Sequence, residues 1–248
     1  MNQYLKETKL LNFKSSFIQK LVKERQWESD DDFIKIQKIY NFVRDEIKFG
    51  YNIDDAISAS DILLDGYGQC NTKGTLFMAL LRSVGIPCRI HGSTIRKELQ
   101  KGAMTGIVYE LAPQNILHSW VEVQYEERWY NIEGFILDKI YLKKLQEKFS
   151  EYTASFCGYG VATDNFQNPQ IDWNANDTYI QKEGINNDYG VFNSPDQLFE
   201  KHTQQLSMLK KWIFQNIGRI LMNRNVEKIR QNHDISAKDM SSFSRTEK

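Results

Sequence analysis

The stretch from Gly66 to Gly92 places a cysteine at the predicted start of a buried helix. After Cys70, apolar residues recur at helical spacing, and Gly85 and Pro87 predict the end of the helix. The first turn of a helix has unpaired N–H groups and the positive end of the helix dipole, which favour a thiolate there. The chemistry that Cys70 offers is therefore nucleophilic attack. The alternative is a small buried hydrophobic residue, as most free cysteines are.

A histidine and a glutamate are predicted to approach each other in a hairpin. HSWVEVQY and RWYNIEGFIL have the composition of strands, and Glu126, Glu127 and Arg128 form a polar turn between them. Pairing of these strands places His118 and Glu133 near the open end of the hairpin, close enough for a hydrogen bond. The alternative for Glu133 is an ordinary carboxylate at a strand end, facing solvent.

The elements that must position these residues form an α+β pattern. Two amphipathic helices are predicted before the cysteine, over about 13–26 and from Ser29 or Asp30 to about 47, with a short helix near 60–64. After the cysteine helix the period changes, and 88–95, 105–111, 118–125 and 128–137 have the composition of short strands. Glycine at position 74 destabilises a helix by about 1 kcal/mol relative to alanine. We therefore expect that another element, such as a crossing strand, needs the space at this position.

The remainder of the chain is predicted to be an extension. A short helix is expected over 141–149, followed by a long segment without clear period at 155–193 that is typical of a surface loop. Ser194 begins a helical stretch that runs to about Gln231, with a break near Ser207. Its basic amphipathic part, 208–230, is expected to pack on its own domain. The alternative is that this part contacts a membrane surface or a partner protein. The polar tail from 232 is expected to be disordered.

Composition excludes several classes of function. Lys plus Arg equals Asp plus Glu at 32 each, so we expect no nucleic-acid partner. A hydrophobic content of 41% suits a globular protein, yet no apolar run approaches the ~20 residues of a membrane span. The N-terminal segment has lysines where a signal peptide would be apolar, which predicts a cytoplasmic protein.

No metal or cofactor is expected. The three cysteines, at 70, 88 and 157, lack the spacing of a disulfide framework or a metal clip, and the four histidines form no HxxxH pair. The acidic run at 30–32 lacks the later ligands of a calcium loop and fits a helix start. GYGQCN has Asn71 where a dinucleotide-binding fingerprint requires glycine, and no strand pattern precedes it.

Three ordered blocks together resemble the transglutaminase-like superfamily of papain-like cysteine enzymes. YGQC followed by an apolar helix ending in GIPCR is similar to that family's nucleophile helix. HSWVEV resembles its histidine strand, and RWYNIEG resembles the tryptophan strand that bears the third catalytic residue. The resemblance covers about 33–138 and implies a bacterial-type, stand-alone member. The implied fold is α+β: N-terminal helices, a nucleophile helix packed on an antiparallel sheet, and a C-terminal helical extension.

The resemblance implies roles for three residues. Cys70 is the nucleophile, His118 the base that takes its proton, and Glu133 the acid that orients the imidazole. The family's usual third residue is aspartate, so Glu133 is a departure by one methylene, with Asp138 and Asn131 as weaker substitutes. The oxyanion would be held by the Cys70 backbone N–H and a second donor, for which Gln69, Tyr51 and Asn52 are candidates.

The expected domains are a catalytic core at 1–150, an irregular loop at 151–193, a helical extension at 194–231 and the tail at 232–248. The implied function is hydrolysis of an amide or peptide bond through a thioester acyl-enzyme. One alternative keeps the acyl-enzyme but passes the acyl group to an amine, as a transglutaminase does. Another is an inactive family member that binds a protein through its cleft or its basic helix.

Overall fold

A four-stranded antiparallel sheet forms the centre of the fold. The computed structural model describes residues 2–231, and the predicted disordered tail at 232–248 lies outside the described residues. The sheet has the order β5-β4-β3-β8, built from β3 (Cys88–Arg96), β4 (Asn115–Tyr125), β5 (Arg128–Ile132) and β8 (Ile185–Phe192). Two further pairs of short strands are β1 (Lys48–Phe49) with β2 (Tyr67–Gly68) and β6 (Phe156–Gly158) with β7 (Val161–Thr163).

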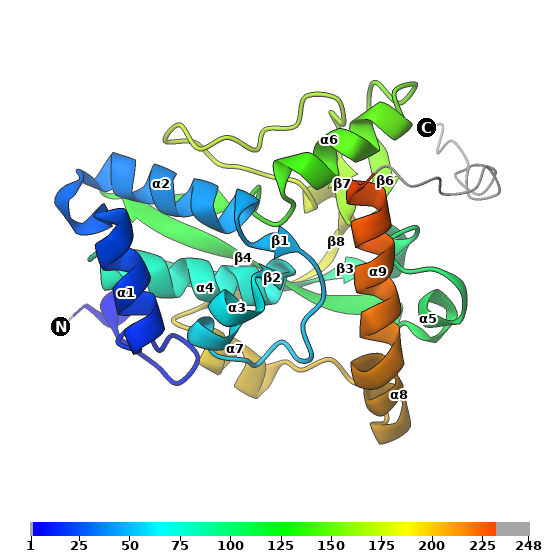
Figure 1. Ribbon diagram of the computed structural model, residues 1–248, viewed down its shortest axis with the longest axis horizontal. Coiled ribbons are helices and arrows are strands. Elements are labelled where there is room, and N and C mark those ends of the chain that lie inside the picture. The colour runs from blue at the N-terminus through cyan, green and yellow to red at the C-terminus, as the bar shows by residue number, and fades with distance from the viewer. Residues whose placement is uncertain (1, 232–248) are drawn as a thin grey trace.

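Helix α4 packs against β3 and β4, and Figure 1 shows it running along the sheet. The helices are α1 (Ser16–Arg25), α2 (Asp32–Asp45), α3 (Ala59–Asp65), α4 (Cys70–Ser83), α5 (Gly106–Leu111), α6 (Lys139–Lys148), α7 (Pro195–Lys201), α8 (Met208–Ile213) and α9 (Arg219–Arg230). Short 3₁₀ turns occupy Gln3–Leu5, Trp27–Ser29, Lys97–Gln100 and Lys182–Gly184, and a π turn at Phe214–Gly218 joins α8 to α9. The predicted α+β class is confirmed, with the helix that begins at Cys70 packed on an antiparallel sheet.

The N-terminal helices begin where their capping residues predict. The Ser15 side chain accepts a hydrogen bond from the Ile18 N–H at the start of α1, and Asp31 does the same for Ile34 at the start of α2. The buried face of α2 includes Ile36, Ile39, Tyr40 and Val43. These helices pack against α4 and complete the main hydrophobic core.

The predicted hairpin is present, with β4 and β5 joined by a tight turn. Glu126 and Glu127 both have left-handed backbone angles, with φ of 46° and 63°. Two residues with positive φ give the turn twist that suits a two-residue hairpin loop. The register pairs Val121 with Ile132, which places His118 and Glu133 at the open end.

Gly74 lies on the face of α4 that packs on β4. A Cβ atom at Gly74 would lie 3.5 Å from a methyl carbon of Val121 and 3.8 Å from the ring of Phe135. Both distances are ordinary van der Waals contacts. The expectation that a strand passes nearby is confirmed, but the approach leaves room for a methyl group.

Gly74→Ala is therefore expected to stabilise the protein. Alanine is favoured over glycine within a helix by about 1 kcal/mol, and the added methyl fits against Val121 and Phe135. Urea unfolding should show a rise in the unfolding free energy of up to about 1 kcal/mol. A loss of similar size would mean that the helix and the sheet approach more closely than described.

Two strand predictions are wrong. The segment 105–111 forms helix α5, preceded by Thr105 as N-cap. Strand β3 already has β4 on one side and β8 on the other, so the segment has no place beside it in the sheet. The strand predicted at 128–137 ends at Ile132, and the chain then turns through Gly134, where a Cβ atom would lie 2.9 Å from the Ile171 backbone.

The segment at 151–193, predicted to be one irregular loop, contains three strands. β6 and β7 form a small hairpin, and β8 joins the main sheet beside β3. The exposed residues Asn186, Asn187 and Asp188 give β8 no alternating apolar pattern. Backbone pairing with β3 holds this edge strand in place, and such pairing leaves no periodic signal in the sequence.

The C-terminal extension breaks where it was predicted to break. α7 ends at Lys201, α8 begins at Met208 with Ser207 as N-cap, and α9 packs on the core through Met222, Val226 and Ile229. The expected packing on its own domain is thus confirmed for α9. It is wrong for the outer face of α8, where Met208, Leu209 and Trp212 are exposed.

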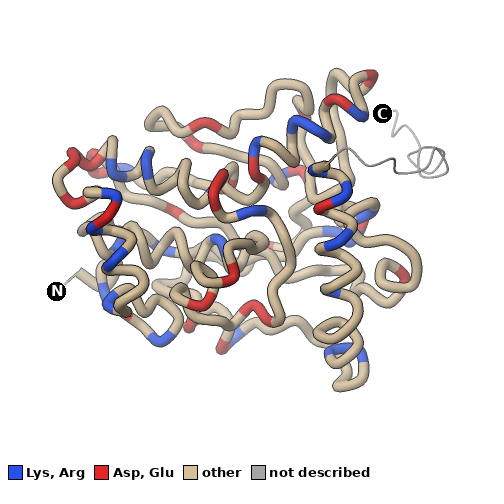
Figure 2. The backbone as a smooth tube through the Cα atoms, viewed as in Figure 1, with Lys and Arg blue, Asp and Glu red and all other residues tan. Residues whose placement is uncertain are grey.

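Charges of both signs are interspersed along the chain in Figure 2, in keeping with equal numbers of basic and acidic residues. Among residues 2–231, no helix has both the length and the apolar composition needed to cross a membrane.

His91, on the sheet, is held between two carboxylates. Its Nδ1 lies 2.8 Å from Glu122 Oε1 and its Nε2 lies 2.7 Å from Asp188 Oδ1. Because carboxylates only accept hydrogen bonds, both ring nitrogens must donate, as in the imidazolium form. Partial burial opposes protonation, but the hydrogen bonds to Glu122 and Asp188 outweigh it and raise the pKa of His91. His91 is structural, as its side-chain contacts indicate.

His91→Gln is expected to destabilise the protein more at pH 6 than at pH 9. A raised pKa means that the stabilisation is fully present below the unfolded-state pKa of about 6.5 and is lost as pH rises through the folded-state value. The test compares the unfolding free energies of wild type and variant in urea at both pH values. A difference that does not change with pH would contradict an imidazolium shared by Glu122 and Asp188.

Candidate active site

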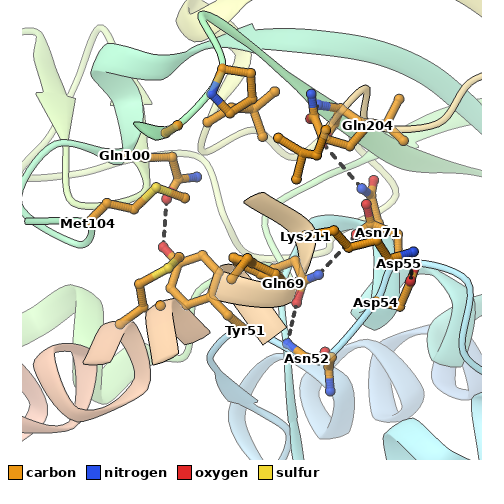
Figure 3. A pocket seen from close by; sticks show the side chains of 18 of the residues that line it. Tyr51, Asn52, Asp54, Asp55, Gln69, Asn71, Gln100, Met104, Gln204 and Lys211 are labelled. Carbon is orange, nitrogen blue, oxygen red and sulfur yellow. Dashed lines mark hydrogen bonds and ion pairs between the residues drawn. The ribbon is translucent and has the colours of Figure 1, made fainter. Parts of the chain in front are cut away.

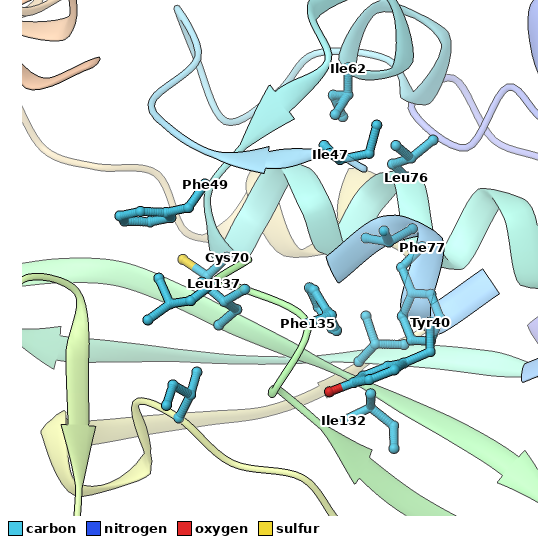
Figure 4. Packing of buried hydrophobic residues seen from close by; sticks show 14 of the residues in the cluster. Tyr40, Ile47, Phe49, Ile62, Cys70, Leu76, Phe77, Ile132, Phe135 and Leu137 are labelled. Atoms are coloured by element: carbon cyan, nitrogen blue, oxygen red, sulfur yellow. The ribbon is translucent and has the colours of Figure 1, made fainter. Parts of the chain in front are cut away.

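Cys70 is the first residue of helix α4. Gln69 is the N-cap, and its side chain and that of Thr72 form reciprocal hydrogen bonds with the backbone of the first turn. Gly68 allows the close turn into the helix, since a Cβ atom there would lie 2.6 Å from Thr72 Oγ1. Cys70 is 7% exposed, and Figure 4 shows it beside Leu137 at the edge of the hydrophobic core. The sequence therefore predicted both the helix start and the placement of the thiol.

His118 lies on β4 and is fully buried. Its Nε2 lies 2.9 Å from Glu133 Oε1, as the hairpin predicted. A carboxylate can only accept, so Nε2 carries a proton and donates it. Within residues 2–231, Nδ1 has no hydrogen-bond partner in this geometry, although His118 interacts with Cys70. The imidazole thus links the thiol to the carboxylate.

The electrostatics of the pair favour a charged imidazole. Burial disfavours the imidazolium, but the charge of Cys70 and the hydrogen bonding of His118 to Cys70 and Glu133 outweigh it. Together they raise the pKa of His118 to about 10. At neutral pH this raised pKa favours the imidazolium form of His118.

Glu133 is almost completely buried and its carboxylate is held at both oxygens. Oε1 accepts from His118, and Oε2 accepts the backbone N–H groups of Ile180 at 2.8 Å and Gln181 at 2.9 Å. The Glu133 backbone N–H donates to Thr178. The extra methylene of glutamate is accommodated because the segment 178–181 holds its far oxygen.

The segment 178–181 was not among the predicted site residues. It lies within the stretch that has no hydrophobic period, and it reaches Glu133 across 45 or more positions of the chain. A short parallel bridge between Ile132 and Thr178 positions it. No local pattern could have found it.

The two weaker substitutes for Glu133 have other partners. Asp138 caps helix α6 through the Tyr141 N–H and forms a buried ion pair with Arg230 at 2.7 Å. Asn131 accepts a hydrogen bond from the Trp120 indole and bonds to Asp177. Glu133 is the acidic residue that the structure brings to His118.

The candidates for the second oxyanion donor are all engaged, as Figure 3 shows for Tyr51 and Gln69. The Tyr51 hydroxyl donates to Gln100 at 2.6 Å, and Asn52 Nδ2 donates to Asp65 and Tyr67. Gln69 Nε2 donates to Asp55. The Cys70 backbone N–H, at the first position of α4, has no intrahelical acceptor.

The remaining cysteines lack this setting. Cys88 is buried in β3, and its burial raises the pKa of the thiol to about 11. Burial of Cys157 likewise raises its pKa, although part of the side chain is exposed. Over the described part of the chain, no group of three or more His, Cys, Asp or Glu residues could hold a metal ion.

Comparison with known proteins places the core of the chain in a family. Residues 19–134 match the sequence profile of the transglutaminase-like superfamily. These residues belong to that superfamily. The matched segment contains Cys70, His118 and Glu133, whereas the segment 178–181 and the C-terminal helices lie outside it.

Two further proteins resemble the chain over limited lengths. An uncharacterized protein of Bacillus subtilis, YebA, is 38% identical over 68 residues, which are 27% of this chain and 9% of YebA. A crystal structure of a candidate cysteine protease from Cytophaga hutchinsonii aligns over 78% of this chain and 47% of that chain, with 12% identity and a TM-score of 0.45. This chain thus spans less than half of each protein's length, and no conclusion about activity rests on them.

Proposed function

We propose that the protein is a cysteine-dependent hydrolase that cleaves amide or peptide bonds through a thioester acyl-enzyme. The observation that carries this proposal is the buried chain of contacts from Cys70 through His118 to Glu133. In this proposal Cys70 supplies the nucleophile, His118 carries the proton, and Glu133 fixes the tautomer of the imidazole. Membership of residues 19–134 in the transglutaminase-like superfamily supports it.

The acylation step uses the thiolate–imidazolium pair. The Cys70 sulfur attacks the carbonyl carbon of the amide, and the negative charge that develops on the oxygen lies toward the start of α4. The C–N bond then breaks as His118 Nδ1–H donates its proton to the leaving amine. The products are a free amine and a thioester on Cys70.

The deacylation step returns the site to its first state. Neutral His118 takes a proton from water, and the resulting hydroxide attacks the thioester carbon. The C–S bond breaks, which releases a carboxylic acid and the Cys70 thiolate. Glu133 holds Nε2–H throughout, so the same nitrogen, Nδ1, transfers the proton in both steps.

Mass spectrometry of the intact protein tests the proposal. A library of short peptides and simple amides is expected to yield an acyl adduct on Cys70, followed by release of the acid. Absence of an adduct or of cleavage with every compound would count against the proposal.

The same experiment with a labelled amine separates hydrolysis from transfer. Label in the product would mean that an amine, rather than water, attacks the thioester, which is the transglutaminase alternative. Release of the free acid alone supports hydrolysis. The protein-binding alternative predicts neither product, and the hydrogen bond between His118 and Glu133 supports the enzyme proposal over it.

A further inference from the structure

A cavity of about 270 Å³ opens beside Cys70, and its walls are mainly apolar. They come from α5, from the π turn after α8, from α9 and from the start of β4. Figure 3 shows the interior of this cavity. The apolar residues that line it include Met104, Val108, Leu111, Ile116, Phe214 and Leu221.

Two amide side chains in the cavity wall, Asn71 and Gln204, already have hydrogen-bond partners. Asn71 donates to the Leu117 carbonyl at 3.2 Å and accepts from Ser119 at 2.8 Å. Gln204 accepts from the Leu117 N–H at 2.8 Å and donates to the Asn115 carbonyl at 3.2 Å. These hydrogen bonds connect neighbouring segments of the wall, so the amide groups of Asn71 and Gln204 are not free to bind a ligand.

The charged side chains at the mouth are also engaged. Asp54 and Lys211 form an ion pair at 2.8 Å, which Figure 3 shows as a dashed line. Lys210 donates to the Leu111 carbonyl, and Asp55 accepts from Gln69. The cavity thus offers little to attract a charged ligand into its interior.

One lining residue has an unused acceptor. Gln181 is 1% exposed, its Nε2 donates to the Gly160 carbonyl, and its Oε1 has no hydrogen-bond partner within residues 2–231. An unpaired acceptor in a buried site is costly unless a ligand supplies a donor. Because the Gln181 backbone N–H binds Glu133, this acceptor belongs to the catalytic end of the cavity. An amide N–H of the substrate is a fitting donor.

We propose that this cavity binds the acyl part of the substrate and that the substrate is an amide with an uncharged, linear apolar acyl chain of medium length. The inference rests on the proposed function, since it assigns the acyl group that Cys70 would receive. The amide lies at Cys70 and Gln181, and the chain extends between α5 and α9. A volume of about 270 Å³ is near the lower end for small-molecule sites, roughly 300 Å³, which limits the chain's length.

Because the amide side chains of the cavity wall are already hydrogen-bonded, an acyl chain fits the cavity better than a peptide does. A buried peptide brings one N–H and one carbonyl per residue, and each requires a partner. Asn71 and Gln204 would have to give up their present bonds to supply them. An acyl chain needs only apolar contact, which the cavity provides.

Two p-nitrophenyl esters test the inference in the full-length protein. The octanoate is expected to acylate Cys70 with a kcat/KM at least about a hundredfold higher than the acetate, because six additional methylenes enter an apolar site. Leu111→Glu should reduce this ratio to near one, because a charged side chain in the wall removes the apolar contact that favours the longer chain. Ile140→Glu, at an exposed apolar residue of α6, is the matched control and should keep the ratio.

Binding of octanamide to the Cys70→Ala variant separates this inference from the proposed reaction. Calorimetry is expected to detect octanamide but not acetamide, and Leu111→Glu should remove the octanamide signal. Binding without turnover of either ester would mean that the cavity is correctly assigned and the reaction is not. Turnover of both esters at similar rates, or equal binding of both amides, would overturn the inference and leave the proposed function standing. A small peptide amide cleaved faster than octanamide would also overturn it.

Discussion

Cys70→Ala is expected to abolish acyl-enzyme formation and turnover, because no other thiol has the same setting. Cys88 lies in the core and Cys157 has no imidazole beside it among the described contacts, so neither can replace the nucleophile. The loss should exceed about 10³-fold in kcat/KM for any substrate found. Intact-mass spectrometry and steady-state rates on the same preparation measure both quantities.

Cys157→Ala is the matched control, since it removes the exposed thiol and leaves the core unchanged. It should keep full activity. Cysteine and alanine differ by one sulfur atom, so the replacement of buried Cys70 should lower the unfolding free energy by no more than about 1–2 kcal/mol and leave the protein folded. Retained turnover in Cys70→Ala would exclude the triad as the source of activity.

The C-terminal extension contributes directly to the proposed site. Asn223 of α9 bonds to both the N–H and the carbonyl of Tyr51, which lines the cavity beside Cys70. Arg230, near the end of α9, pairs with Asp138 and donates to the Phe49 carbonyl. These bonds connect the extension to the segment 49–51 and, through Asp138, to the segment that follows Glu133. The helices beyond the matched family segment are thus part of the cleft, rather than an appendage to it.

Short-range features of the fold could be predicted because their causes are local. The helix start at Cys70 follows from the glycine turn and the apolar spacing after it, and the hairpin follows from two strand patterns around a polar turn. The hydrogen bond between His118 and Glu133 agrees with the hairpin register, which brings both residues to the open end of the hairpin. These sequence patterns are compatible with few other local structures.

Long-range features could not be predicted because their causes lie elsewhere in the chain. β8 is held by backbone pairing to β3, which does not depend on an apolar pattern in β8. Helix α5 forms where a strand was predicted, since both sides of β3 are occupied. The backbone donors that hold Glu133, at Ile180 and Gln181, come from a segment with no periodic signal. Contacts with this segment, which the sequence does not reveal, accommodate glutamate in place of aspartate.

Glu133→Gln is expected to reduce kcat/KM by about 10²–10⁴-fold, through the tautomer of His118. The N–H groups of Ile180 and Gln181 require an acceptor, so the glutamine oxygen must face them. Its NH₂ group then faces His118 Nε2, which must become an acceptor. The ring proton moves to Nδ1, so the neutral imidazole can no longer accept the proton of Cys70.

The rate of Cys70 alkylation by iodoacetamide at pH 7 gives a direct readout of this effect. It should fall in Glu133→Gln and in His118→Ala, because both variants remove the imidazolium that stabilises the thiolate. Glu133→Asp should lose less, about tenfold in kcat/KM, since the carboxylate remains but cannot reach His118 and the segment 178–181 at once. Glu127→Gln, in the exposed hairpin turn, is the control. If Glu133→Gln kept the wild-type alkylation rate, Glu133 would be a structural residue, and the link from thiol to carboxylate would not be the source of reactivity.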